Sequence, residues 1–251
     1  MTSFTISIAG HSVEVHALFE STRDYCRKYL TEELPSLTVT VTREDLEHQQ
    51  ALAFEEAHQE GLKPRVFTGP FLERTAIQCK IAEGLTERGI LLLHGSAVAV
   101  DGQGYLFTAR CGTGKSTHTR YWRETFGTRS TMINDDKPFL RFTEEAVLVC
   151  GAPWSGKHGL DTNITVPLRG ICILERGPED LIRAISPEEA LPMLYHQSQE
   201  PEEEHLKEYY RGLVEQLAQR VPLYHMTCTK NPKAALTAYN AMSPHTEGEE
   251  L

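Results

Sequence analysis

The sequence lacks a long apolar run, a stripe of basic residues and a secretion signal, and each absence excludes a class of protein. The longest strongly apolar segment, residues 89–100, is too short to cross a bilayer and is interrupted by His94. The N-terminus has no basic segment followed by an apolar one, so we expect no signal peptide. A formal net charge of −10 without a basic cluster argues against nucleic acid as the main partner.

Regular cysteine and histidine spacings are missing as well. The six cysteines form no CxxC pair, and the eleven histidines form no HxxxH or HExxH pattern. This usage is typical of reduced thiols and gives no zinc-site signature. With 40% hydrophobic and 24% charged residues, the composition predicts a soluble, cytoplasmic globular protein without a membrane or nucleic-acid partner.

Residues 104–127 have the pattern of a short strand, a glycine-rich loop and a helix. The strand "GYLFTA" leads into "RCGTG" and then into a helix that starts at "KS". This order is typical of a P-loop, in which backbone N–H groups and the helix N-terminus hold phosphates. The first glycine of the usual pattern is replaced by Ala109. The residues expected to bind the nucleotide are Arg110, Cys111, Gly112, Thr113, Gly114, Lys115, Ser116 and Thr117, with Lys115 reaching the β- and γ-phosphates and Ser116 binding Mg²⁺.

Two adjacent aspartates follow the next expected strand. The segment "STMINDDKPF" reads as a strand that ends at Asp135 and Asp136. In P-loop proteins an acidic residue in this place helps to hold Mg²⁺. A second carboxylate can accept the proton of an incoming hydroxyl group. Two aspartates also suit an ordinary turn, but next to a P-loop we favour the metal and base roles.

These segments resemble the bacterial HPr kinase/phosphorylase family and its relatives, a P-loop class that includes phosphoenolpyruvate carboxykinase. The resemblance covers roughly residues 90 to 175 and is carried by "HGSAVAVDGQGYLFTARCGTGKST" and "INDDKPF". It implies that Lys115 and Ser116 contact nucleotide phosphates and Mg²⁺. It also implies that Asp136 is the better candidate for the general base and Asp135 for the metal ligand, and that His94 is an active-site histidine.

The chain departs from that family in three places. Thr117 replaces a glutamate after the P-loop serine, and Cys111 stands where the family favours serine. The arginine-rich signature with which the family binds its protein partner is not recognisable. The resemblance therefore supports the chemistry and an α/β fold with a mixed sheet, and it does not support HPr as the substrate.

A third segment, residues 151–163, places Lys157 and His158 between glycines. A lysine on such a loop could cover the transferred phosphate or recognise an acidic acceptor. In the resemblance, Lys157 takes the place of an arginine near the active site. An exposed loop that joins two strands is the alternative interpretation.

The pattern of expected helices and strands changes near residue 85. Residues 1–85 read as a hairpin that turns at Gly10, followed by helices and a strand, and we expect an N-terminal α/β region. Residues 86–251 alternate apolar strands, one of them over 90–100, with short turns. They then become helical near 187–198, 202–219 and 231–242. We predict a P-loop core with C-terminal helices here, and whether the two parts are separate domains or one body stays open.

The predicted function is an ATP-dependent kinase that transfers the γ-phosphoryl group of Mg–ATP to a hydroxyl of a small metabolite or of a serine on a protein or peptide. One alternative is a carboxykinase-like or a phosphate- or pyrophosphate-dependent phosphotransferase, for which Lys137, Lys157 and Arg169 are the available cations. A non-catalytic nucleotide-binding sensor is another. The sequence leaves open the acceptor, the base preference and whether the chain forms a homo-oligomer.

Overall fold

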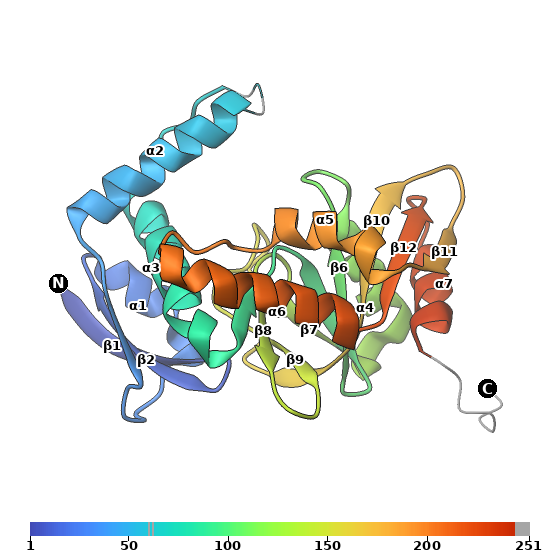
Figure 1. Cartoon of the computed structure of the whole chain (residues 1–251), viewed down its shortest axis with the longest axis horizontal. Helices are drawn as coiled ribbons and strands as arrows, with labels where there is room; N and C mark the ends of the chain where they lie inside the picture. The colour runs from blue at the N-terminus through green and yellow to red at the C-terminus, as the bar shows by residue number, and fades with distance from the viewer. Residues whose placement is uncertain (60, 62, 244–251) are drawn as a thin grey trace. The chain divides into compact units, whose positions relative to one another are not determined.

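The computed structural model describes residues 1–59, 61 and 63–243. It is a mixed α/β structure that divides into two compact units, Met1–Leu85 and Thr86–Leu251 (Figure 1). No helix in the described part of the chain is both long and apolar enough to traverse a bilayer.

Unit 1 is a small sheet with helices. Its strands are β1 (Thr2–Ile8), β2 (His11–Ala17) and β3 (Leu37–Thr40), and its helices are α1 (Glu20–Tyr25), α2 (Arg43–Gln59) and α3 (Gly69–Leu85). β1 and β2 form the expected antiparallel hairpin, which turns at Gly10 with φ +82°. The helix after it, α1, is short. It ends at Tyr25, and a 3₁₀ turn (Arg27–Tyr29) leads the chain back to β1 through the bridge between Ile6 and Leu30.

A buried carboxylate fixes the start of α1. Glu73, on α3, has no exposed surface and accepts hydrogen bonds from the backbone N–H groups of Leu18 and Phe19 and from the hydroxyl of Thr22. These donors lie at the N-terminus of α1, where free N–H groups and the helix dipole favour an anion. Glu73 therefore has a structural role inside unit 1.

Unit 2 contains, among its described residues, a nine-stranded mixed sheet. Its strands are β4 (Ile90–Leu92), β5 (Ser96–Val100), β6 (Gln103–Thr108), β7 (Ser130–Asn134), β8 (Phe139–Phe142), β9 (Val147–Cys150), β10 (Thr165–Arg176), β11 (Leu181–Ala184) and β12 (Leu223–Cys228). The main path runs β4-β8-β9-β10-β6-β5-β7, and β12 pairs with β10 and β11. The mixed sheet expected from the sequence is confirmed.

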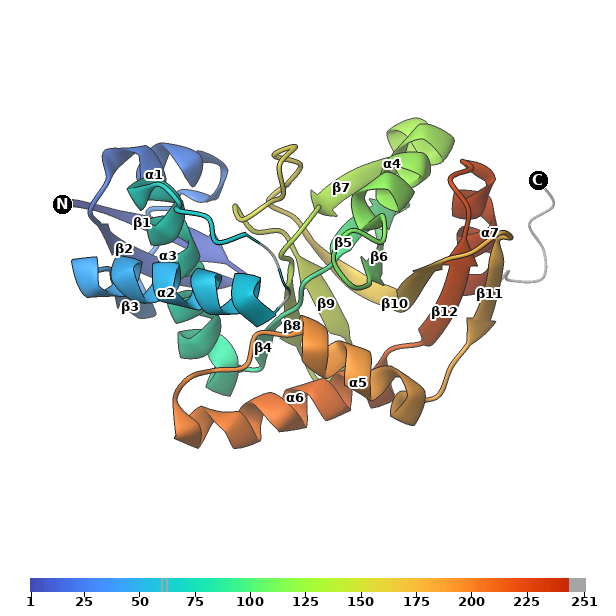
Figure 2. The same ribbon diagram turned by 90° about the horizontal axis from the view of Figure 1, so that it is seen from above.

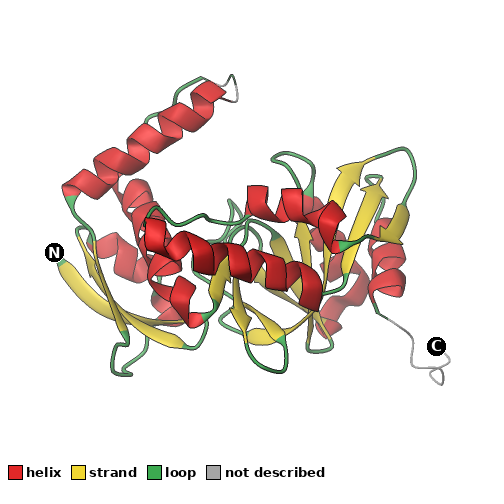
Figure 3. Ribbon diagram, viewed as in Figure 1, coloured by secondary structure: helices red, strands yellow, loops and turns green. Residues whose placement is uncertain are grey.

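The long strand β10 joins two parts of this sheet. Its first residues pair antiparallel with β9, and its later residues pair parallel with β6 and β12. A register shift between Leu168 and Gly170 lies within the pairing with β6, shortly after the residues that pair with β9. Such a bulge bends a strand and increases its twist. The sheet is consequently curled, as the strands in Figure 3 show.

Helices cover both faces of the sheet. They are α4 (Lys115–Phe126), α5 (Pro187–Gln197), α6 (Lys207–Arg220) and α7 (Lys233–Met242). One apolar core includes Leu194 of α5 and Leu217 of α6, and the other includes Trp122 of α4 and Ala238 of α7. Figure 2 shows α5 and α6 along one side of the unit and α4 and α7 along another. Each helix thus buries one apolar stripe against the sheet.

The expected single strand over residues 90–100 is wrong. The chain forms β4 and β5 instead, in different parts of the sheet, with β4 beside β8 and β5 between β6 and β7. At the break, the N–H of His94 donates to the carbonyl of Gln197 at 2.7 Å, and that of Gly95 donates to the carbonyl of Asp136 at 2.9 Å. These hydrogen bonds to distant segments take the place of the strand-to-strand hydrogen bonds that a continuous strand would make. Two further strands, β8 and β11, were not expected from the sequence.

Candidate active site

The loop between β6 and α4 turns at two glycines. Gly112 has φ +74° and Gly114 has φ +121°, and an added Cβ would meet no atom within 4 Å at either position. Backbone conformation, and not space, therefore requires glycine there. Ala109 is fully buried, and its φ is not positive. The alanine in place of the usual first glycine consequently causes no backbone strain.

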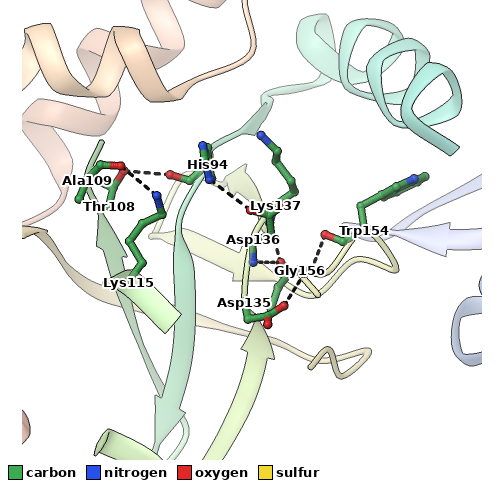
Figure 4. A network of polar contacts seen from close by, with 10 residues as sticks. His94, Thr108, Ala109, Lys115, Asp135, Asp136, Lys137, Trp154 and Gly156 are labelled. Atoms are coloured by element: carbon green, nitrogen blue, oxygen red, sulfur yellow. Dashed lines mark hydrogen bonds and ion pairs between the residues drawn. The ribbon is translucent and has the colours of Figure 1, made fainter. Parts of the chain in front are cut away.

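Lys115, the first residue of α4, points back along this loop. Its side chain is buried, and its Nζ donates to the carbonyl of Ala109 at 2.9 Å (Figure 4). Burial lowers the pKa of the Lys115 ammonium, partly offset by the nearby Asp136 carboxylate. No side chain caps the α4 N-terminus, whose N-cap residue is Gly114. The loop thus combines a buried cation with an uncapped helix N-terminus, which favours an anion.

Asn134 organises the turn that carries the two aspartates. It is fully buried, and its Nδ2 donates to the carbonyl of Ala152 at 2.7 Å. Its Oδ1 accepts from the N–H groups of Asp136 and Lys137 at 2.8 and 2.6 Å. The side chain therefore fixes this turn to the segment after β9. Sequence reasoning assigned Asn134 no role, although it directly precedes the aspartates.

Asp135 is buried, and in the described structure only one of its two carboxylate oxygens has a hydrogen-bond partner. Its side chain is 3% exposed, and Oδ1 accepts from the N–H of Gly156 at 2.6 Å. Oδ2 is buried without a hydrogen-bond partner in the described structure. Burial raises the pKa of Asp135, with Asp136 adding to the rise and the Gly156 N–H and His158 opposing it. A buried carboxylate oxygen without a partner fits a cation as its ligand.

Asp136 is hydrogen-bonded to His94. His94 Nε2 lies 3.1 Å from Asp136 Oδ1 (Figure 4). Burial by itself raises the pKa of Asp136, but the His94 hydrogen bond and the charges of Lys137 and Lys115 outweigh it, so the pKa is lowered. Burial lowers the pKa of His94 in spite of the bond to Asp136. At neutral pH we therefore expect an ionised Asp136 beside a neutral His94.

These groups line one cleft of about 700 Å³. The loop and α4 contribute Gly112, Gly114, Lys115, Ser116 and Thr117, and the opposite wall contributes His94, Asp135, Asp136 and Lys157. The structure thus brings together most of the site residues that the sequence singled out. Lys157 lies in the cleft, as one of the two interpretations of its loop requires.

The remaining loop residues face a different cavity. Arg110, Cys111 and Thr113 line a pocket of about 550 Å³, in which Gly112 also takes part. The guanidinium of Arg176, at the end of β10, donates to the carbonyls of Gly112 and Thr113. The 110–117 segment expected to hold one nucleotide therefore borders two cavities, and Gly112 contributes to both.

Two arginines in the cleft were missed by sequence reasoning. Arg120 and Arg123, on α4, line the cleft together with Ser116 and His158. The Nε of Arg123 is buried without a hydrogen-bond partner in the described part of the chain. Residues 116, 120 and 123 are spaced to share one helix face, which is the signal that could have identified both arginines.

The described residues contain no group of three or more His, Cys, Asp or Glu side chains that could hold a metal ion. Magnesium commonly takes one or two carboxylates from the protein and completes its shell with water and substrate phosphates. Asp135 Oδ2 and the hydroxyl of Ser116 are two oxygens at the cleft of the kind that magnesium binds.

Neither a protein-family model nor a curated protein matches the sequence. Among solved structures, the Hpr(Ser) kinase/phosphatase from Coxiella burnetii matches with a TM-score of 0.36 and 12% identity. The match covers 59% of this chain and 94% of that chain. With so low a TM-score, any assignment of function rests on the residues of this chain.

Proposed function

We propose that this chain is an ATP-dependent kinase that uses Mg²⁺ and transfers the γ-phosphoryl group to a hydroxyl acceptor. The observation that carries the proposal is the composition of the cleft. One wall is a glycine-rich loop with Lys115 at the N-terminus of a helix, and the other holds two carboxylates in different environments. An anion site that faces a metal ligand and a base is what phosphoryl transfer requires.

The nucleotide phosphates would bind at the 110–117 loop. Lys115 would exchange its bond to the Ala109 carbonyl for phosphate oxygens, and the N–H groups at the start of α4 would donate to the same chain of phosphates. Asp135 Oδ2 and Ser116 would hold Mg²⁺, which supplies charge neutralisation when it is bound. This arrangement gives the unpartnered oxygen of Asp135 a ligand.

Asp136 would take the proton of the acceptor. The acceptor oxygen attacks the γ-phosphorus, an O–P bond forms, and the bond to the β-phosphate oxygen breaks and releases ADP. The proton of the hydroxyl moves to the Asp136 carboxylate. His94, neutral and hydrogen-bonded to Asp136 at 3.1 Å, keeps this carboxylate ionised and oriented.

The proposal is tested by following γ-labelled ATP in a native cell extract with the wild type and with Lys115→Ala. We expect label to move to a defined small molecule or polypeptide with the wild type only. Lys233→Ala, which removes a cation outside the cleft, is the matched control and should transfer as the wild type does. Wild-type transfer no higher than that of Lys115→Ala would refute the kinase.

Asp136→Asn separates a kinase from a nucleotide-binding sensor. A kinase predicts that this variant keeps its affinity for Mg–ATP and loses transfer, because only the proton acceptor is removed. A sensor predicts tight binding of Mg–ATP without turnover in the wild type and in the variant alike. Isothermal titration and the labelled-ATP assay, performed on both proteins, distinguish the two functions.

A further inference from the structure

A second cavity borders the phosphate loop on the side away from the aspartates. It combines a pocket of about 550 Å³ with an adjoining one of about 290 Å³. The two share Arg110, Ile173, Met193 and His225, and we call them together the flanking pocket. Its size lies in the range of small-molecule sites, roughly 300–1,000 Å³. The proposed phosphoryl transfer gives this pocket no role.

The order of the strands indicates on which side of the loop each end of a bound nucleotide would lie. Across the sheet the order is β7-β5-β6-β10-β12, and the loop follows β6. Asp135 and Asp136 follow β7 on one side of the loop, so the reacting end of the polyphosphate lies there. The other end must then point toward β10 and β12. The flanking pocket lies on that side, since Ile173 belongs to β10 and His225 to β12.

The loop joins the cleft to the flanking pocket without a break. Gly112 lines both, and Arg176 at the end of β10 holds the carbonyls of Gly112 and Thr113. A molecule whose phosphates lie along the loop therefore has its continuation at the mouth of the flanking pocket. Inorganic pyrophosphate has no such continuation, whereas a nucleoside triphosphate has a ribose and a base.

The walls of the flanking pocket suit a flat heterocycle. Ile173, Ile185 and Met193 provide apolar surface, and a methionine thioether packs well against an aromatic ring. The guanidinium of Arg110 can stack on the other face of such a ring. These groups match the two faces of a base.

The rim of the flanking pocket supplies polar partners for the edge of the base. Glu175 Oε2 lies 3.1 Å from His225 Nε2, and both residues line the pocket. The Glu175 side chain is 64% exposed, so its carboxylate can accept further hydrogen bonds. The exocyclic amino group of a purine is a donor that fits this acceptor.

We infer that the flanking pocket binds the purine base of the phosphoryl donor, which makes the donor a nucleotide and not pyrophosphate. The inference rests on the proposed function, because it takes the 110–117 loop as the phosphate site. It assigns Met193 and Arg110 to the faces of the base and Glu175 to its amino group. Base recognition is thereby separated from the cleft in which the acceptor must bind.

The test compares two ligands that share the phosphates but not the base. Binding of the Mg²⁺ complexes of β,γ-imido-ATP and of inorganic tripolyphosphate is measured by isothermal titration. For the wild type we expect a preference for the nucleotide of at least about tenfold. In Met193→Trp, whose indole would fill the pocket, we expect this preference to fall by about tenfold. Tripolyphosphate affinity should stay within about twofold, which also shows that the variant is folded and its phosphate loop intact.

Leu181→Trp is the matched control, because Leu181 is 62% exposed on β11 and does not line the flanking pocket. It should bind both ligands as the wild type does. Glu175→Ala is a second variant at a 64% exposed side chain, and because it removes the acceptor assigned to the amino group, it should weaken nucleotide binding alone. Equal wild-type affinity for the two ligands, or an undiminished preference in both pocket variants, overturns the inference. If neither ligand binds to the wild type, the proposed function falls as well.

Discussion

Replacing Asp135 with asparagine should make the free protein more stable while it weakens the binding of Mg–ATP. The Asp135 carboxylate is 3% exposed, and its Oδ2 has no partner in the described structure. A buried polar atom without a partner costs about 1–3 kcal/mol, and a charge adds to this cost. The asparagine Oδ1 can keep the 2.6 Å bond from the Gly156 N–H, and its Nδ2 takes the place of Oδ2, so the substitution removes the charge but not the buried polar atom. We therefore expect the free energy of unfolding to rise by up to about 1 kcal/mol at pH 7.

The sign of the pH dependence follows from the raised pKa of Asp135. An acid whose pKa is higher in the folded than in the unfolded state stabilises the fold while it is protonated in both. That contribution is lost as the pH rises from the unfolded pKa of about 3.9 through the folded pKa. The gain from Asp135→Asn should consequently be small near pH 4 and grow toward neutral pH. Thermal unfolding of both proteins over this range measures it, at roughly 2–4 °C per kcal/mol.

The neighbouring aspartate is a matched control of opposite sign. The pKa of Asp136 is lowered by His94, Lys137 and Lys115, so its charge stabilises the fold above its unfolded pKa. Asp136→Asn should therefore lower the stability at pH 7, by less than about 1 kcal/mol because the His94 pair is partly exposed. In the presence of Mg–ATP the wild type should gain more stability than Asp135→Asn does. If Asp135→Asn destabilises the protein at every pH, as Asp136→Asn should at neutral pH, the reasoning is refuted.

Three further predictions concern titratable and nucleophilic groups near the loop. His94→Ala removes the hydrogen bond that lowers the pKa of Asp136, so the acid limb of the pH–rate profile should move to higher pH. An acid limb that does not move would contradict the assignment of Asp136 as the general base. Burial lowers the pKa of His118 to about 4, so proton uptake by this residue in the unfolded chain should lower the stability by about 3 kcal/mol between pH 7 and pH 4. Urea titration over this range should therefore show a loss of stability that is smaller by this amount in His118→Gln than in the wild type. Cys111 is exposed, whereas the other five cysteines are buried or half-buried. Iodoacetamide should therefore modify Cys111 first, and it should do so more slowly when Mg–ATP is present. Equal labelling of all six cysteines would contradict this prediction.

Most of the features near the glycine-rich loop could be predicted because they are local in sequence. The order of strand, glycines, Lys115 and helix occupies one continuous segment, and positive φ at Gly112 and Gly114 depends on adjacent residues. The cap of α5 was equally predictable, since the Ser186 side chain accepts from the N–H of Glu189 three residues later. The two aspartates were recognised because they follow an apolar strand directly.

Features that depend on distant segments were not predictable. The apolar pattern of residues 90–100 is continuous, and only hydrogen bonds from His94 and Gly95 to remote carbonyls divide it into β4 and β5. For the same reason, adjacency could not separate the roles of the aspartates. Within the described structure, Asp135 is distinguished by its hydrogen bond from Gly156 and by an oxygen without a partner. Asp136 is distinguished by its contact with His94.

The sequence by itself determined the order of strand, glycine-rich loop, Lys115 and helix, followed by paired acids, because those signals need only neighbouring residues and ordinary backbone preferences. The tertiary structure decided what surrounds them. It placed Lys157, Arg120 and Arg123 in the cleft with the aspartates, and it formed the flanking pocket from strand ends and α5. Burial and pairing across the fold also set the opposite pKa directions of Asp135 and Asp136, since desolvation and charge depend on which segments pack together.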